Sequence, residues 1–169
     1  PSIITGSSVT GAIKTFDGFY GFFRSIKLLH ERSKKATMPV ICSPTSTVNL
    51  ISVDWVSETI IGLLGVPSTN KTFNLVHDQP PKVRWVIETG LRHLGIPHEW
   101  LAVESLGNAN GISGALERYR PYLFGDTHFG TTAVHEALGH LCNTPPAIDE
   151  QYLRRILDYA VKANWGYIP

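Results

Sequence analysis

Three groups of residues have types and spacings that could support chemistry. Thr5 to Gly11 follows an apolar run and contains two glycines, which is typical of loops that bind phosphate groups. His135 and His140 enclose a glutamate, close to the pattern of a helical zinc site. Tyr159 precedes Lys162 by three positions, close to the tyrosine and lysine pair that passes a proton to a carbonyl oxygen. Each of these chemistries, however, requires a specific spacing.

The glycine-containing loop lacks two features of a dinucleotide-binding fingerprint. Its middle glycine is missing, and no acidic residue ends a second strand about 20 residues later. The residues from Phe16 to His30 have helical spacing where that strand would have to be. The loop is not a P-loop either, because Ala12 and Ile13 stand where Lys and Ser or Thr are required. We therefore favour a plain strand-to-loop transition over a cofactor fingerprint.

The histidines and tyrosines also have the wrong spacing. On a helix, five positions rotate His140 by about 140° from His135, and Gly139 indicates a helix end between them. We expect helix-terminal or surface histidines and no metal site. None of the six tyrosines has a lysine four residues later, and the sequence has no Gly-x-Ser-x-Gly elbow or paired-carboxylate cluster. We therefore assign no catalytic residue to this chain.

The first third of the chain is predicted to alternate between strands and helices. Ser2 to Thr5 is a short β-rich run, and Pro39 to Cys42 is a short extended piece. Phe16 to His30 is predicted to be an aromatic-rich helix. An apolar strand-like run begins at Val48, and Asp54 is expected to cap the helix after it. That helix is expected to bury Val56, Ile60 and Leu63 or Leu64.

The remainder is predicted to contain a β-α-β unit followed by helices. Thr72 to Val76 is the first strand, Val83 to Leu94 is a helix ended by Gly95, and His98 to Val103 is the second strand. The linker from Ser105 to Gly114 is rich in Gly and Asn and is expected to be mobile. The later elements are a helix near Ala115 to Tyr122 and a last helix from Asp149, as its cap, to Ala163.

The composition limits the classes of partner and compartment. The 169 residues, 43% of them hydrophobic, suit a single domain covering residues 1–169. The net charge of +1 gives no electrostatic reason to expect a nucleic acid or a membrane as partner. Cys42 and Cys142 lack the spacing of a disulfide framework or a zinc knuckle. With no membrane segment or signal peptide recognised, we expect a cytoplasmic protein.

Several soft motifs occur in an order that resembles the C-terminal half of an extended short-chain dehydrogenase/reductase. They are Pro1-Ser2-Ile3-Ile4-Thr5-Gly6, Phe16-Asp17-Gly18, Asn49 to Val56, Thr72-Phe73-Asn74-Leu75, and the Phe129 region with Ile148-Asp149. Within the NAD-dependent epimerase/dehydratase superfamily, the chain is most similar to thioester-reductase and fatty acyl-CoA reductase-like domains. The resemblance implies an α/β fold, a partial Rossmann-like arrangement holding the C-terminal strands of a parallel sheet, plus a mostly helical substrate-binding lobe.

The resemblance also implies where ligands would bind. The parent protein would use NADP or NAD, and Pro1, Ser2, Ile3 and Ile4 would pass beside the nicotinamide. The aromatic helix and the segment from Leu116 to Phe129 would wall the substrate. The implied substrate-binding residues are Phe16, Phe19, Tyr20, Phe23, Tyr122 and Phe129.

The function expected from the resemblance is that of a substrate-binding part of an NAD(P)H-dependent reductase for a carbonyl or acyl thioester. The Gly-rich fingerprint and the catalytic residues would precede Pro1, so we expect the isolated chain to be inactive and to bind no cofactor alone. Its partners would be a small-molecule or carrier-bound acyl substrate and either the missing N-terminal half or a second copy, which would cover a bare strand edge. A non-catalytic binding module and half of an epimerase/dehydratase remain alternatives.

Overall fold

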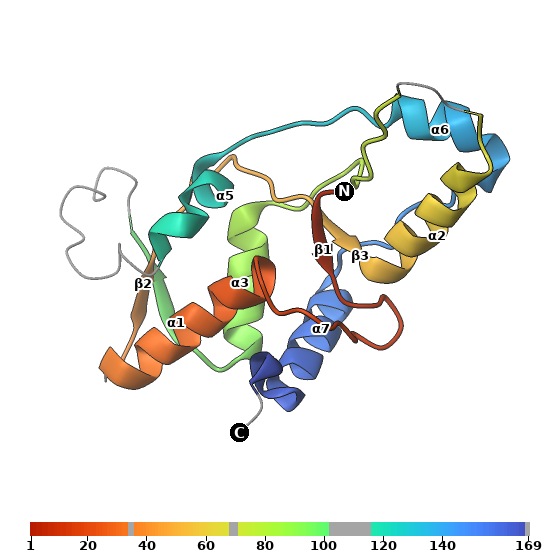
Figure 1. The fold of residues 1–169 in the computed structure, drawn as a ribbon. Coiled ribbons are helices and arrows are strands. Elements are labelled where there is room, and N and C mark those ends of the chain that lie inside the picture. Colours follow the sequence, from red (N-terminus) through yellow and green to blue (C-terminus); the bar gives the residue numbers. More distant parts are fainter. Residues whose placement is uncertain (34–35, 68–70, 102–115, 168–169) are drawn as a thin grey trace.

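The computed structural model describes residues 1–33, 36–67, 71–101 and 116–167, and it contains two short pairs of parallel strands (Figure 1). β1 (Ile3–Thr5) pairs with β3 (Leu50–Ser52), with Ile3 opposite Leu50. β2 (Met38–Val40) pairs with β4 (His98–Trp100), with Met38 opposite His98. Parallel strands together with covering helices confirm the predicted α/β class.

The predicted strand from Thr72 to Val76 does not form, so the predicted β-α-β unit is wrong. β4 pairs with β2 instead of with this segment. The segment still runs beside β1, because Ser2 N–H donates to the Leu75 carbonyl at 3.0 Å. The Asn49 side chain supplies the next bonds, accepting from His77 N–H and donating to the His77 carbonyl, each at 2.8 Å. A side-chain amide thus replaces the backbone ladder that a strand would need.

Three helices carry most of the core: α1 (Phe19–Ser33), α3 (Val83–His93) and α7 (Glu150–Lys162). α1 begins three residues later than predicted, after Gly18, whose φ of 52° is left-handed and non-helical. The predicted ends of the other two helices are confirmed. Gly95 follows α3 with a φ of 67°, and Asp149 Oδ1 accepts a 2.7 Å hydrogen bond from Tyr152 N–H at the start of α7.

α2 (Val53–Leu64) differs from the prediction in its cap and in its buried face. Ser52 occupies the N-cap position, and Asp54 lies inside the first turn. The helix buries Trp55, Val56 and Thr59, whereas Ile60 and Leu64 are 45% and 81% exposed. The predicted burial of Val56 is confirmed, and Leu63 packs against the core, but Ile60 does not. The Trp55 ring enters the core in addition, and its Nε1–H donates to the Asn143 carbonyl at 2.7 Å.

The shorter elements follow β4. They are η2 (Glu117–Tyr119), α5 (Arg120–Phe124), α6 (Thr132–Leu138), η3 (Gly139–Leu141) and η4 (Asn164–Gly166). η2 and α5 take the place of the helix predicted near Ala115 to Tyr122. The predicted linker and the end of the predicted strand at Val103 lie outside the described residues. Within the described ranges, no helix has the length and apolar character needed to cross a membrane.

The apolar residues form two core clusters on opposite faces of β3. Leu50 joins the larger cluster, which α1, α3 and α7 build, and Ile51 joins a smaller one between α2 and α6. Successive side chains of a strand point to opposite faces, so neighbouring residues enter different cores. Figure 1 shows α1, α3 and α7 on one side of β1 and β3, and α2 with α6 on the other.

Candidate functional site

An open cleft of about 680 Å³ lies at the N-terminal end of β1. Its volume is in the range of small-molecule sites. The cleft is lined by Pro1, Ser2, Ile3, Ile4, Thr15, Asp17, Gly18, Thr47, Asn49, Pro121, Tyr122, Gly125, Thr127 and Phe129. Four segments that are far apart in the sequence therefore meet around one hollow.

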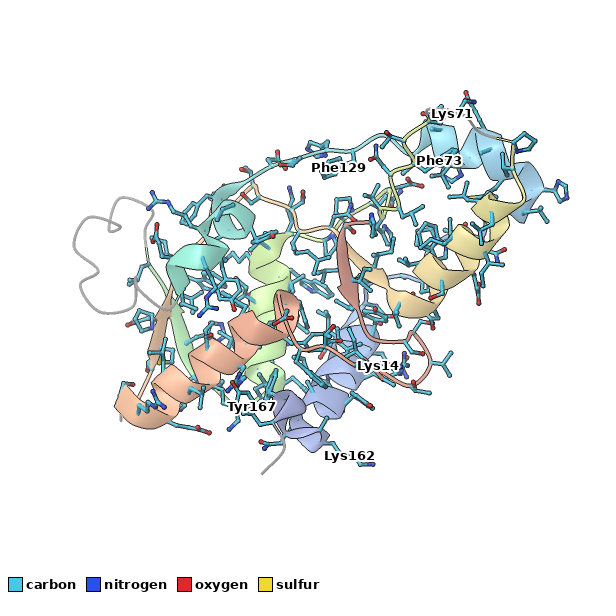
Figure 2. The ribbon with its side chains drawn as sticks, viewed as in Figure 1. Lys14, Lys71, Phe73, Phe129, Lys162 and Tyr167 are labelled. Carbon is cyan, nitrogen blue, oxygen red and sulfur yellow. The ribbon has the colours of Figure 1, made fainter. Side chains whose placement is uncertain are left out.

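The cleft brings together six of the ten predicted binding residues. All four predicted cofactor-side residues, Pro1 to Ile4, form one wall. The predicted substrate-side residues Tyr122 and Phe129 form another, and each is 51% exposed. Figure 2 shows Phe129 on the extended segment that runs from α5 to α6. The Ser2 and Ile3 N–H groups already donate to Leu75 and Asn49 carbonyls, so a cofactor carboxamide would have to meet other groups of this wall.

The four aromatic residues predicted from the first helix do not line the cleft. Tyr20 and Phe23 are core residues, each 1% exposed, and Phe19 is also buried. Phe16 precedes α1 and packs edge-on against Tyr20, with ring centroids 5.4 Å apart. These rings pack against different parts of the core: the Phe23 ring lies against Gly90 of α3, the Tyr20 hydroxyl meets Gly6 at the end of β1, and Phe16 stacks near Tyr159 of α7.

Several polar residues of the cleft were not among the predicted binding residues. Asp17, Thr47, Asn49 and Thr127 line it. Asn49 is the most connected, because its Oδ1 also accepts a 2.8 Å hydrogen bond from Ser2 Oγ. Thr47 Oγ1 donates to Asp126 Oδ1 at 3.3 Å and so links two walls. Asn49 stood within a recognised motif, but nothing in its spacing indicated a role.

The loop after β1 uses its backbone donors internally. Ser7 N–H donates to the Ala12 carbonyl at 3.0 Å, and Gly11 N–H donates to the Ser7 carbonyl at 2.8 Å. Ser8 N–H and Ser8 Oγ both donate to Asp54 Oδ2 at 2.8 Å. A phosphate-binding loop needs such N–H groups free to face its ligand. The loop therefore fits the plain transition predicted for it and does not fit a pyrophosphate.

The Asp54 carboxylate binds this loop to the start of α2. Burial raises the pKa of its carboxyl group, but the Ser52 hydroxyl and the hydroxyl and N–H of Ser8 outweigh this effect and lower the pKa to about 2. Arg155 holds the same loop from α7 by donating to the Ser8 carbonyl. The N-terminal end of α2 and the middle of α7 are thus tied together through a single turn.

Two buried tyrosines hold the end of β1. Gly6 N–H donates to the Tyr20 hydroxyl at 2.7 Å, and the Tyr152 hydroxyl donates to the Gly6 carbonyl at 3.0 Å. The Tyr152 hydroxyl also lies 2.5 Å from Thr5 Oγ1. Burial raises the pKa of both tyrosines, that of Tyr152 to about 12. Both are therefore neutral at physiological pH, which suits a positioning role for the strand end and not proton transfer.

The other chemical candidates lie away from the cleft. α6 ends at Leu138, as Gly139 predicted, and His135 Nε2 lies 3.6 Å from Asp78 Oδ2. The Tyr159 ring stacks near Phe16 with centroids 6.4 Å apart, while Lys162 lies at the outer edge of α7 (Figure 2). Both cysteines are free thiols, and burial raises the pKa of each.

The chain matches no family model and no curated protein. It does match solved structures. The terminal R domain from the myxalamid PKS-NRPS biosynthetic pathway is 20% identical, with a TM-score of 0.68 over 96% of this chain and 43% of that chain. A thiolation-reductase di-domain from an archaeal non-ribosomal peptide synthetase is 17% identical, with a TM-score of 0.70 over 97% of this chain and 35% of that chain.

A third matched structure is an epimerase and not a reductase domain. UDP-glucose 4-epimerase from Bifidobacterium longum, in complex with NAD+ and UDP, is 13% identical, with a TM-score of 0.60 over 98% of this chain and 47% of that chain. The chain thus spans less than half the length of each of these structures. It has the α/β fold of one part of these structures, a partial Rossmann-like arrangement with a mostly helical lobe.

Proposed function

We propose that this chain is the substrate-binding part of an NAD(P)H-dependent reductase that acts on a carbonyl or on a small-molecule or carrier-bound acyl thioester. The observation that carries the proposal is the cleft, where the strand residues Pro1 to Ile4 face Tyr122 and Phe129 across one hollow. A hydride donor on the strand side would then meet a carbonyl held against the aromatic side. The fold shared with two reductase domains supports this assignment.

In this reductase, the chain would bind the substrate, and another part of the protein would bind most of the cofactor. The loop after β1 has no free backbone donors for a pyrophosphate, so NADP or NAD would be held mainly by other sequence. The wall from Pro1 to Ile4, with the Asn49 amide behind it, would contact only the nicotinamide end. The chain alone would bind substrate weakly and would not reduce it.

The test compares substrate binding with turnover. An acyl-pantetheine thioester is titrated into the purified chain, and NADPH or NADH oxidation is followed with the same thioester. We expect measurable binding, no oxidation, and about tenfold weaker binding for Tyr122→Ala. Tyr167→Ala is the matched control, because Tyr167 is a similarly exposed tyrosine, 55% against 51%, outside the cleft. Normal turnover by the chain alone, or no effect of Tyr122→Ala, would refute the proposal.

A second candidate is part of an epimerase or dehydratase, which the UDP-glucose 4-epimerase match favours. A UDP-sugar is the discriminating ligand. Binding of a UDP-sugar in the same cleft, with no thioester binding, would select this alternative over the reductase. A non-catalytic binding module would retain ligand binding but show no hydride transfer when a cofactor-binding part is supplied.

A further inference from the structure

A second, smaller cavity lies beside the cleft, between α1, α3 and α5. Its volume is about 50 Å³. Its lining is almost wholly apolar and includes Phe22 and Phe23 of α1, Val86 and Ile87 of α3, and Leu123 of α5. Cavities lined in this way stay dry and accept small apolar molecules.

The cavity meets the cleft at three shared residues. Ile3, Gly18 and Tyr122 line both hollows. Gly18 has a φ of 52°, which favours glycine, and it adds no side chain to this junction. A Cβ at this position would lie 3.8 Å from Ile3 Cγ2, an ordinary van der Waals contact. Tyr122 is half exposed and stands on the short helix α5. The two hollows therefore adjoin at Ile3, Gly18 and Tyr122.

We propose that this cavity receives the apolar tail of the substrate and limits it to a short chain, an inference that rests on the proposed function above. An apolar cavity of about 150 Å³ holds the six carbons of benzene, so about 50 Å³ holds roughly two methylene-sized groups. A longer chain would meet the buried rings of Phe22 and Phe23, which line the cavity from α1. The favoured substrates are therefore short acyl or carbonyl compounds and not long fatty chains.

The experiment titrates the purified chain with straight-chain primary alcohols from ethanol to octanol and follows the backbone amide signals by NMR. Alcohols need neither cofactor nor hydride transfer, so failure of this proposal is distinguishable from failure of the reductase proposal. We expect affinity to rise about fourfold for each methylene until roughly two are buried, and then to level. The signals of Val86 and Ile87 should move most. A rise that continues to octanol, no binding, or shifts confined to Ile60, Ile61 and Leu64 would each overturn the proposal.

Two variants of one wall residue sharpen the test. Val86→Phe fills the cavity and should weaken butanol binding at least tenfold. Val134→Phe is the control, since Val134 is equally buried, 2% against 3% exposed, but belongs to the smaller cluster between α2 and α6. Val86→Ala enlarges the cavity with little risk to folding and should move the levelling point to a longer alcohol. Unchanged butanol affinity in folded Val86→Phe, or an unchanged levelling point in Val86→Ala, would contradict the assignment.

Discussion

The two sides of β3 are built to different degrees of closure. On the side of α1, α3 and α7, the core around α7 is sealed, since Leu153, Ile156 and Leu157 are 0% exposed, and the small cavity lies farther away, between α1, α3 and α5. On the side of α2 and α6, the cluster is small, and α2 also presents Ile60, Ile61 and Leu64 to solvent at 45%, 69% and 81% exposure. The second side therefore carries apolar residues on both faces of one helix.

This difference indicates where other sequence would meet the chain. A helix that is apolar on both faces is normally buried on both. We propose that the outer face of α2, formed by Ile60, Ile61 and Leu64, contacts either the cofactor-binding part or a second copy of the chain.

The largest contrast should come from cavity-forming substitutions in the two cores. Leu153→Ala in the sealed core should lower the free energy of unfolding by about 4 kcal/mol, within the range for fully buried leucines. Leu138→Ala in the smaller cluster should cost only about 2 kcal/mol, because its surroundings can relax toward solvent. Urea denaturation measures both values. Equal or reversed losses would remove the distinction between the two sides.

A pair of glycine substitutions tests how tightly each side is packed. Gly90→Ala in α3 would place its Cβ 2.3 Å from Phe23 Cε1, so we expect a loss of about 1–3 kcal/mol from overpacking. Gly65→Ala, after α2, has an ordinary φ of −84° and room around the new methyl group. It should raise stability by about 0.5 kcal/mol. Thermal melts of both variants check the signs, and a neutral Gly90→Ala would argue against a tight contact between α1 and α3.

The stability that the hydrogen bonds between Asp54 and Ser8 contribute should depend on pH. The pKa of Asp54 is lowered to about 2 from 3.8. Its contribution to the free energy of unfolding is therefore complete above about pH 4 and is lost as the pH falls toward 2. Asp54→Asn should cost about 1 kcal/mol at pH 7, less than for a fully buried carboxylate because Asp54 is partly exposed. The difference from the unmodified chain should shrink in acid. Urea unfolding at pH 7 and pH 3 measures this difference, with Glu58→Gln on the same helix as control. A difference that does not change with pH would contradict the stabilising role of the Asp54 carboxylate.

The smallest effect on stability should come from the outer face of α2. Ile61→Ser and Leu64→Ser together should change the free energy of unfolding by less than about 0.5 kcal/mol for each residue, since both side chains are largely exposed. They should nevertheless reduce self-association or binding to a cofactor-binding part, measured by light scattering or sedimentation. A chain that is strictly monomeric before and after the substitutions, and binds no such part, would leave this face without the proposed role.

The sequence alone was sufficient for the features that depend on neighbouring residues. The helical period of α3 and α7, the glycine that ends α3 and the aspartate that caps α7 were all predicted and confirmed. The order of soft motifs also led to the right fold, although no single motif was specific. Local hydrogen bonding and side-chain period determine such features, so they can be read along the chain.

Tertiary structure decided which faces point inward and which residues share a site. Trp55 is buried while Ile60 is exposed, the aromatic residues from Phe16 to Phe23 pack into the core instead of lining the cleft, and Asn49 supplies the bonds of a strand that does not form. The cleft itself joins Pro1 to Phe129, residues that are adjacent only after folding. These outcomes depend on competition among distant side chains for the same buried volume, which no local pattern records.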